Sequence, residues 1–333
     1  MMLRRIALAA ALFFALAAPQ AAPAATLLNV SYDPTREFYS EIDAHFAAYW
    51  KKTTGEDVNV QLSFGGSGSQ ARAVIEGLDA DVVTLALSYD IDAIAKQAKL
   101  VAPDWATRLP DNSSPYTSTI VLVVRKGNPK HIRDWNDVAR PGVGAVAANP
   151  KTGGGARWNF LAAYSYGLKR NNNDDAKARA LVTAIYKNMV VLDPAARAAA
   201  ITFAERGIGD VLVAWENEAI LLTRLHPGEY EIVVPSVSIL AEPPVTWGDA
   251  NVAKHGTTRG AQAYLRYLYT PDGQRIACKW GYRPRMVSVY GTCGTHFART
   301  DLTSIVNFGG WNAAQARFFV EGAMFDQMMG AAK

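Results

Sequence analysis

Cysteine and histidine are scarce in this sequence, and its charges nearly balance. The 333 residues include two cysteines and five histidines, and the formal net charge is +4. Two cysteines without a histidine pair at metal-binding spacing supply too few ligands for a zinc site, so we expect no metal and no other cofactor. A charge this small gives no reason to expect a nucleic-acid partner.

Long hydrophobic runs are absent except near the N-terminus. Two arginines precede an apolar run at residues 6–18, and residues 22–24 (Ala-Pro-Ala) then fit the small-x-small pattern before a cleavage site. The run is shorter than the ~20 residues that a spanning helix needs. We interpret residues 1–24 as a cleaved signal peptide rather than a membrane anchor. We therefore expect a soluble, periplasmic protein that is a monomer.

The two cysteines, Cys278 and Cys293, acquire a meaning from this export. In an oxidising compartment, two cysteines at this separation predict a disulfide. A pair of free thiols is the alternative.

The remaining chain alternates predicted strands and helices. Strands are expected at residues 27–31, 58–64, 81–87, 117–124, 144–148 and 211–215, with helices between them. Repeated βα units predict an α/β fold of mainly parallel sheets flanked by helices. The roughly 300 residues of the mature chain exceed the usual size of one domain, which predicts two lobes.

The boundary between the lobes is expected in a stretch rich in Pro, Asp, Asn and Ser at residues 109–116. We predict that residues 25–112 and 242–333 form lobe one and that residues 113–241 form lobe two. The C-terminal part is expected to be helical, including residues 261–269 and 312–327.

Three loop-to-helix junctions carry the chemistry. They are Gly65-Gly66-Ser67-Gly68-Ser69, Lys151-Thr152-Gly153-Gly154-Gly155 and Asp193-Pro194-Ala195-Ala196. A helix N-terminus presents free backbone N–H groups and the positive end of a dipole, and glycine lets a ligand approach the backbone. One such junction is ordinarily a turn, but three that converge would form an anion site without a cationic side chain.

Two rival chemistries start from the first junction. Residues 66–71 match the dinucleotide pattern G-x-G-x-x-A after a strand, but export separates the protein from cytoplasmic NAD. Ser67 as a nucleophile would need a glycine at position 69, which is serine, and a histidine partner. An exported serine hydrolase that uses Ser67 stays as the alternative from a different class. Four aspartates bracket a strand, and we expect all of them to be solvated: Asp79, Asp81, Asp90 and Asp92.

Long stretches of the chain resemble the periplasmic sulfate-binding proteins of ABC importers, which are type II periplasmic binding proteins. The stretches are NVSYDPTREFY (29–39), GGSGSQA (65–71), ADVVTLALSYDIDAI (80–94), LPDNSSPYTSTIVLVVRKGNPK (109–130), NPKTGGGARWNFLAA (149–163), ERGIGDVLVAWENEA (205–219), ILAEPP (239–244) and FGGW (308–311). The resemblance covers nearly all of the mature chain and weakens between residues 245 and 307. It implies two lobes with sulfate in the cleft, delivery to an inner-membrane ABC permease, and no catalysis.

The resemblance also implies a set of uncharged donors to the anion. They are the backbone N–H and hydroxyl of Ser67, the backbone N–H groups of Gly154, Gly155 and Ala196, and the indole N–H of Trp215. By the same resemblance Asp33 helps to order the site, although Asp33-Pro34 also reads as the start of a helix with Asp33 as its N-cap. Arg157 and Arg197 lie near the site in sequence, and we expect them to tie down helix ends rather than to bind the anion.

One position departs from the family pattern. The family commonly has a serine immediately before the paired glycines, and this chain has Gly153 there. We expect either weaker sulfate binding or a replacement donor, such as Thr152 or a water. The smaller residue also leaves thiosulfate as an alternative ligand, and molybdate or phosphate binders share the same fold.

Overall fold

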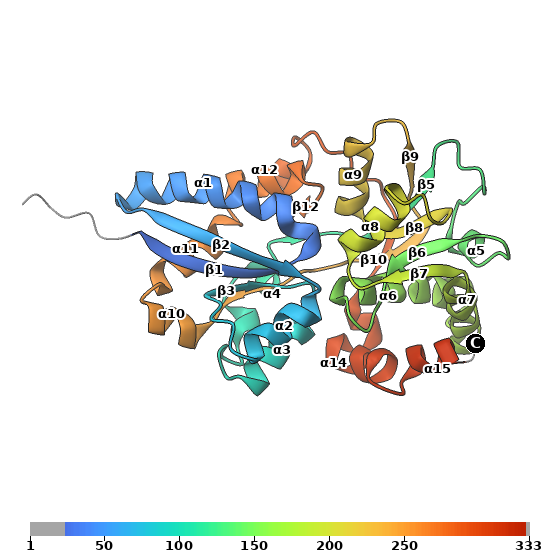
Figure 1. Cartoon of the computed structure of the whole chain (residues 1–333), viewed down its shortest axis with the longest axis horizontal. Coiled ribbons are helices and arrows are strands. Elements are labelled where there is room, and N and C mark those ends of the chain that lie inside the picture. Colours follow the sequence, from blue (N-terminus) through green and yellow to red (C-terminus); the bar gives the residue numbers. More distant parts are fainter. Residues whose placement is uncertain (1–23, 331–333) are drawn as a thin grey trace, which may run out of the picture.

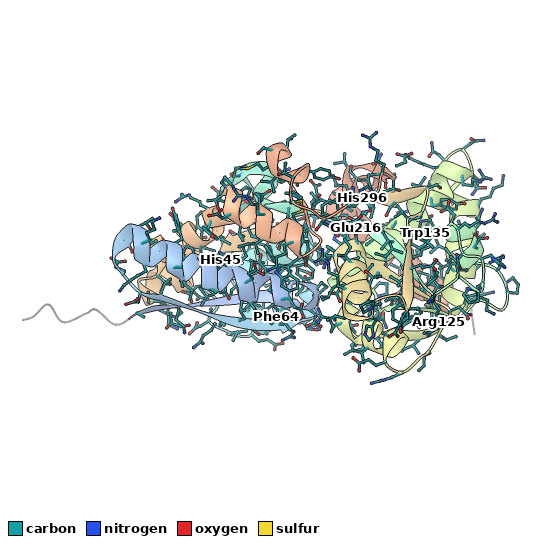
Figure 2. The ribbon with its side chains drawn as sticks, turned by 90° about the horizontal axis from the view of Figure 1, so that it is seen from above. His45, Phe64, Arg125, Trp135, Glu216 and His296 are labelled. Atoms are coloured by element: carbon teal, nitrogen blue, oxygen red, sulfur yellow. A yellow bond between two sulfur atoms is a disulfide. The ribbon has the colours of Figure 1, made fainter. Side chains whose placement is uncertain are left out.

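Two main β-sheets, each flanked by helices, form the two lobes of an α/β molecule, and two further two-stranded sheets accompany them (Figure 1). This computed structural model describes residues 24–330, so residues 1–23 of the expected signal peptide lie outside the described residues. Figure 2 shows the same two lobes side by side, with Phe64 and His45 in one lobe and Arg125 and Trp135 in the other. The predicted α/β class and two-lobed architecture are confirmed.

The first lobe is built on a four-stranded sheet in the order β11-β3-β1-β2. Strands β1, β2 and β3 are parallel and β11 is antiparallel to β3. The strands are β1 (Ala25–Tyr32), β2 (Val58–Gly65), β3 (Val82–Thr84) and β11 (Val245–Trp247). The helices are η1 (Asp33–Thr35), α1 (Arg36–Thr54), α2 (Ser67–Ile75), α3 (Ser88–Gln97), η2 (Trp105–Thr107), α4 (Pro110–Ser113), α10 (Asp249–His255), α11 (Thr258–Tyr267) and α12 (Pro271–Lys279).

Helix α1 illustrates how the sequence forms these elements. Phe38, Ile42, Phe46 and Trp50 recur at helical spacing, and all four are buried in the core of the first lobe. The helix ends at Gly55, whose φ of 76° is the left-handed conformation that closes many helices. The periodic apolar stripe therefore sets both the length and the orientation of the helix.

The second lobe is built on a five-stranded mixed sheet in the order β7-β6-β8-β5-β9. The strands are β5 (Ile120–Arg125), β6 (Ala145–Ala148), β7 (Met189–Asp193), β8 (Val211–Trp215) and β9 (Tyr230–Val233). The helices are α5 (Trp135–Val138), α6 (Gly154–Arg170), α7 (Asp175–Lys187), α8 (Ala196–Ala204) and α9 (Glu216–Leu225). Helix α6 is buried along nearly its whole length, so its N-terminus is held firmly at the edge of the lobe.

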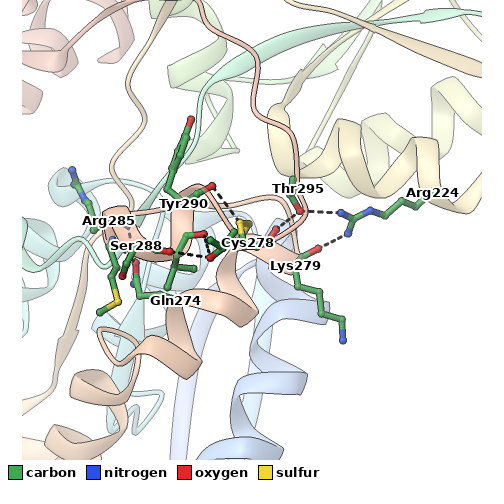
Figure 3. The surroundings of a disulfide bond; sticks show 12 residues. Arg224, Gln274, Cys278, Lys279, Arg285, Ser288, Tyr290 and Thr295 are labelled. Atoms are coloured by element: carbon green, nitrogen blue, oxygen red, sulfur yellow. Dashed lines mark hydrogen bonds between the residues drawn. A yellow bond between two sulfur atoms is a disulfide. The ribbon is translucent and has the colours of Figure 1, made fainter.

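The chain passes between the lobes three times. Ser118 lies between β4 (Tyr116–Thr117) and β5, and Ala241 lies between β10 (Val237–Ile239) and β11. These two residues form an antiparallel β-bridge, so the first two crossings lie side by side. The third runs from β12 (Arg283–Pro284), which pairs with β4, through α13 (Val287–Tyr290) to β13 (Asp301–Thr303), which pairs with β10. Cys278 and Cys293 form a disulfide at the start of this third crossing (Figure 3).

The C-terminal residues from β13 onward pack on the second lobe, so their predicted assignment to lobe one is wrong. The ring of Trp311 lies 4.6 Å from that of Trp158 on α6, and the ring of Phe318 lies 5.4 Å from that of Phe160. These residues share one core with strands of the second sheet. The elements are η3 (Ile305–Phe308), α14 (Gly310–Ala314), the π-helical turn η4 (Gln315–Phe319) and α15 (Met324–Gly330). The expected single helix at 312–327 is therefore broken.

One predicted helix start is shifted, and two other helices begin inside the predicted junctions. Helix α2 begins at Ser67, and α8 begins at Ala196, two residues after Pro194. Helix α1 begins at Arg36, so Asp33 is not its N-cap and instead opens the short turn η1. Propensity alone does not decide whether a glycine- or proline-containing segment is the last of a loop or the first turn of a helix.

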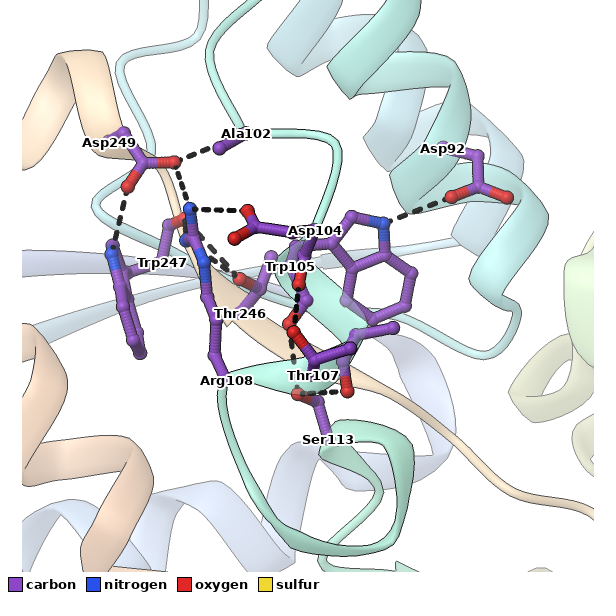
Figure 4. A network of polar contacts seen from close by, with 11 residues as sticks. Asp92, Ala102, Asp104, Trp105, Thr107, Arg108, Ser113, Thr246, Trp247 and Asp249 are labelled. Atoms are coloured by element: carbon purple, nitrogen blue, oxygen red, sulfur yellow. Dashed lines mark hydrogen bonds and ion pairs between the residues drawn. The ribbon is translucent and has the colours of Figure 1, made fainter.

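A polar network ties the segment before the first crossing to the returning strand β11 (Figure 4). Arg108 Nη2 donates to Asp249 Oδ2 at 2.6 Å, and its guanidinium lies 4.6 Å from the ring centre of Trp247. The backbone N–H of Ala102 and the indole N–H of Trp247 also donate to Asp249. One carboxylate thus fixes two passages of the chain at one edge of the first lobe.

Asp81 is buried rather than solvated, contrary to the prediction. It accepts hydrogen bonds from the backbone N–H of Leu28 and the hydroxyl of Thr257, and His255 Nδ1 lies 3.0 Å away. Across residues 24–330 no helix has the length and apolar character that crossing a membrane requires.

Candidate functional site

The N-termini of α2, α6 and α8 meet at one small cavity between the lobes. Helix α2 belongs to the first lobe, and α6 and α8 belong to the second. The cavity is lined by Tyr32, Asp33, Pro34, Gly65, Gly66, Ser67, Ala148, Gly153, Gly154, Gly155, Ala156, Ala195 and Ala196. The three junctions singled out in the sequence therefore come together in space.

Glycine is required where the lobes approach most closely. A Cβ on Gly154 would lie 2.7 Å from the Cβ of Ser67 and 2.9 Å from Asp90 Oδ2. A Cβ on Gly66 would lie 2.9 Å from the carbonyl oxygen of Thr152. Both contacts join one lobe to the other, so a side chain at either position would hold the lobes apart.

Backbone donors dominate the lining of the cavity. The first-turn N–H groups of a helix have no acceptor within their own helix, and they carry the positive end of its dipole. Ser67, Gly154 and Ala196 are each the first residue of their helix, and Gly155 is the second of α6. The arrangement can therefore offer several converging N–H donors to an anion without a positively charged side chain.

The Ser67 hydroxyl is engaged inside the first lobe. It donates to Asp90 Oδ2 at 2.5 Å and accepts from the backbone N–H of Ala86 at 3.0 Å. Asp90, predicted to be solvated, is only 3% exposed. Burial raises the pKa of its carboxyl, against the opposing effects of Arg157 and the Ser67 hydrogen bond.

Trp215 lies at the end of β8 and borders the site through Gly155. Its indole N–H donates to the carbonyl oxygen of Gly155 at 3.0 Å, and its ring lies 5.5 Å from that of Tyr32 in the first lobe. Gly155 and Ala196 line the adjoining cavity together with Trp215. The indole N–H is thus close enough to the first turn of α6 to donate either to the Gly155 carbonyl oxygen or to a ligand bound at that turn.

Thr152 and Gly153 occupy the loop before α6. The Thr152 hydroxyl donates to the carbonyl oxygen of Pro194 at 2.8 Å, which ties the α6 loop to the α8 loop. This hydroxyl is therefore already committed to a protein acceptor. Gly153 has an ordinary backbone conformation (φ −103°, ψ 114°) and is the N-cap of α6. A Cβ there would have its nearest neighbour at 3.4 Å, so a small side chain fits.

The two arginines expected near the site form ion pairs between the lobes. Arg197 on α8 makes a two-pronged contact with Glu37 on α1, at 2.8 and 2.9 Å, and also donates to Glu218 at 3.1 Å. Arg157 Nη1 lies 3.6 Å from Asp90 Oδ1, and its Nε donates to the carbonyl oxygen of Pro150. Neither arginine lines the cavity at the three helix ends.

Asp33, the first residue of η1, lines the cavity. Its carboxylate lies 3.6 Å from Arg36, and burial raises its pKa while Arg36 and Arg197 act in the opposite direction. Sequence reasoning placed Asp33 in the site but missed the carboxylates of Glu37, Asp90 and Glu218. Glu218 lies 21 positions from Arg197 and Glu37 lies 160 positions from it, and no local pattern marks any of the three carboxylates.

Two lobes with a cavity of backbone donors between them define a solute-binding protein. The family model for bacterial extracellular solute-binding proteins matches residues 27–283, and the chain belongs to that family. The residues that line the cavity all lie within the matched range.

Several relatives share nearly the full length of the chain. A sulfate-binding protein of Escherichia coli is 56% identical over 304 residues, which cover 91% of this chain and 92% of the relative. A thiosulfate-binding protein of Pseudomonas aeruginosa is 47% identical over 304 residues, which cover 91% of both chains. The solved structure of the sulfate-binding protein SubI from Mycobacterium tuberculosis has a TM-score of 0.80 and 30% identity, and covers 89% of this chain and 99% of that one.

Proposed function

We propose that this protein binds sulfate in the periplasm and delivers it to an ABC-type permease of the inner membrane. It acts as a carrier rather than an enzyme, and it works without a metal or cofactor. The observation that carries the proposal is the convergence of three helix N-termini on one interlobe cavity, with no lysine, arginine or histidine among the described residues that line it. The relatives named for sulfate and thiosulfate point to the same class of ligand.

The anion is held by the backbone N–H groups of Ser67, Gly154, Gly155 and Ala196 and by the indole N–H of Trp215. The indole exchanges the Gly155 carbonyl oxygen, 3.0 Å away, for an anion oxygen. The Ser67 hydroxyl stays with Asp90, since donating to the ligand would leave a buried carboxylate without its hydrogen bond. Asp33 orders the turn that carries the first-lobe side of the cavity.

The donors that converge on the cavity also select for charge state, because Asp33, the one carboxylate side chain among the lining residues, is paired with Arg36. Sulfate is fully deprotonated at neutral pH, whereas phosphate keeps a proton that needs an acceptor. Asp90 is the nearest carboxylate to Ser67, and its Oδ2 already accepts the Ser67 hydroxyl. An unpaired buried proton donor costs roughly 1–3 kcal/mol, so phosphate binds more weakly.

Thiosulfate is the second candidate ligand, favoured by one specific observation. Gly153 lines the cavity and has room for a Cβ, so this wall of the site is less filled than a side chain would leave it. Thiosulfate is larger than sulfate and would use that room. The serine-hydrolase alternative has no such support, because the hydroxyl of Ser67 pairs with Asp90 and Ala86 and with no histidine among the described residues.

Transport follows from closure of the lobes. The donors come from both lobes, so they converge only when the lobes meet. The Arg197–Glu37 and Arg157–Asp90 pairs join the lobes in the same state. The permease then recognises the closed form, and the protein acts as a monomer with one anion.

Titration calorimetry tests the proposal. The protein is first unfolded to remove any retained ligand and is then refolded for the titration. We expect sulfate to bind more tightly than thiosulfate, and both to bind far more tightly than phosphate or molybdate. Trp215→Phe should weaken sulfate binding by about 10- to 100-fold, since a hydrogen bond to a charged group is worth roughly 1.5–3 kcal/mol.

Trp135→Phe is the matched control. Trp135 is also a buried tryptophan of the second lobe (Figure 2). Its indole N–H donates to the carbonyl oxygen of Val237, and neither residue lines the cavity. It should change stability but not affinity. Equal losses in both variants, or tighter binding of phosphate than of sulfate, would contradict the proposed site.

A further inference from the structure

The third crossing between the lobes is closed into a loop by the disulfide. Cys278 is fully buried at the end of α12 in the first lobe, and Cys293 lies 15 residues later, in the crossing itself. The crossing then continues to β13, which pairs with β10 beside the second lobe. The disulfide therefore shortens the free length of the covalent connection between the lobes.

The closed loop is also held to the second lobe by hydrogen bonds (Figure 3). The Thr295 hydroxyl donates to the carbonyl oxygen of Cys278 at 2.7 Å. Arg224, on α9 of the second lobe, donates to the Thr295 hydroxyl at 3.3 Å and to the carbonyl oxygen of Lys279. One arginine of the second lobe thus contacts the residue that follows Cys278 and Thr295, which lies two residues beyond Cys293.

The segment after Cys293 covers an ion pair between the lobes. Arg283 on β12 donates to both carboxylate oxygens of Glu216 on α9, at 2.6 and 2.7 Å. The two side chains are only 10% and 4% exposed. The ring of Phe297 lies 5.5 Å from the Arg283 guanidinium, and the carbonyl oxygen of Ala298 accepts from Arg283 at 2.8 Å.

The covering of this pair sets how strongly it joins the lobes. Attraction between two charges is weakened by water, so an ion pair that water reaches contributes little. Figure 2 places Glu216 and His296 close to the boundary between the lobes. Burial raises the pKa of the Glu216 carboxyl, while Arg283 and then His296 act in the opposite direction. The loop therefore controls the environment of a contact that lies at the hinge.

We propose that the Cys278–Cys293 disulfide is a redox-sensitive control of the hinge. In the oxidised protein it holds residues 290–298 over the Arg283–Glu216 pair and favours the closed lobes. Reduction by a dithiol transfers two electrons and two protons, breaks the S–S bond into two thiols, and converts the reductant into its own disulfide. The freed segment then moves off the ion pair, and the closed state becomes less populated.

The consequence for the ligand follows from population. A ligand that binds one state has an apparent affinity that is reduced by the fraction of protein outside that state. We expect the dissociation constant for sulfate to rise about fivefold on reduction, a size typical of coupling between distant sites. This part rests on the proposed function, whereas the effect on lobe closure does not.

The experiment compares oxidised protein, protein reduced with dithiothreitol, and Cys293→Ser. Small-angle X-ray scattering without ligand measures the radius of gyration, and calorimetry measures sulfate affinity. We expect reduced protein and Cys293→Ser to be more open and about fivefold weaker in affinity, and dithiothreitol to leave Cys293→Ser unchanged. Identical radii and affinities across the three samples would overturn the proposal. If oxidised protein binds no sulfate, the proposed function fails, while the radii still decide the hinge.

Arg224→Gln provides a second test that leaves the disulfide intact and decides the matter if Cys293→Ser does not fold. It removes the contact between α9 and the loop, so we expect a two- to threefold loss of affinity, smaller than on reduction. Arg275→Gln is the matched control, because within residues 24–330 the ion-pair partner of Arg275 on α12 is the exposed Asp272 of its own helix. Equal behaviour of the two arginine variants would contradict the role given to the loop.

Discussion

The two lobes meet along two edges that are built in opposite ways. At the cavity, the closest contacts are made by glycines and backbone groups, with Gly154 against Ser67 and Gly66 against Thr152. At the hinge, the contacts are charged and covalent, with the Arg283–Glu216 pair under a loop closed by Cys278 and Cys293. The cavity therefore presents mainly backbone dipoles to the proposed ligand, whereas the charged side chains that join the lobes are paired with each other.

This division has a physical reason. A charged side chain at the cavity would need a partner whenever the ligand left, since an isolated buried charge is very costly. Backbone N–H groups at a helix end carry no such requirement, because water replaces the anion when the lobes open. The hinge edge does not exchange ligand, so it tolerates a permanent ion pair.

Gly154→Ala should prevent full closure of the lobes at the cavity and have the largest effect on sulfate affinity. The added Cβ would lie 2.7 Å from that of Ser67, and the lobes would close incompletely. We expect a loss of sulfate affinity of about 100-fold or more, since several hydrogen bonds to the anion depend on closure. Calorimetry measures it, and Gly153→Ala is the control, because its Cβ has no neighbour nearer than 3.4 Å. A similar loss in both variants would mean that close approach at Gly154 is not what matters.

Gly153→Ser should add a hydrogen-bond donor to the cavity and strengthen sulfate binding. The position lines the cavity, has an ordinary backbone conformation and tolerates a Cβ. A hydroxyl that reaches the anion would tighten sulfate binding by about tenfold or more, since such bonds are worth roughly 1.5–3 kcal/mol. Thiosulfate should gain less, because the side chain uses space that the larger anion needs. Unchanged sulfate affinity relative to Gly153→Ala would show that the missing serine is of no consequence.

Asp43 lies at neither the cavity nor the hinge. Asp43→Asn should therefore have the smallest effect on sulfate affinity, within about twofold. Asp43 on α1 accepts a hydrogen bond from the hydroxyl of Tyr264 at 2.6 Å, and its second oxygen has no partner in the part of the chain that the structure describes. Burial raises the pKa of this carboxyl to about 7. The folded protein therefore holds this proton more tightly than the unfolded chain does, and stability falls as pH rises from about 4 to about 7.

The asparagine variant cannot ionise, so it lacks this fall. We expect it to be more stable than the wild type at pH 8 by about 2–4 kcal/mol, with a much smaller difference at pH 4.5. Urea unfolding at the two pH values measures the difference. A gap that did not grow with pH would show that Asp43 ionises freely in the folded protein.

The parts of the fold that could be predicted from the sequence depend on residues that are close together in the chain. The apolar spacing of Phe38, Ile42 and Phe46 specifies a buried helix face, and the three glycine- or proline-containing junctions could each be found as a short motif. Their convergence could only be hypothesised, because it depends on how the two sheets are placed.

The features that sequence reasoning missed depend on distant pairs. Asp90 follows a strand and was expected in solvent, but Ser67 and Arg157 enclose it from two different lobes. The C-terminal helices were assigned to the wrong lobe, because an amphipathic pattern predicts that a face is buried but not which sheet buries it. Trp311 packing on Trp158 settles that placement through contacts more than 150 positions apart.

Arg197 has a consequence for how the anion is let go. Its guanidinium contacts Glu37 across the cleft and Glu218 within its own lobe. When the lobes separate, the contact with Glu37 is lost, but Glu218 continues to neutralise the arginine. The step that frees the cargo therefore leaves no stranded positive charge to attract the departing dianion back, and the emptied carrier is spared that source of rebinding at the membrane.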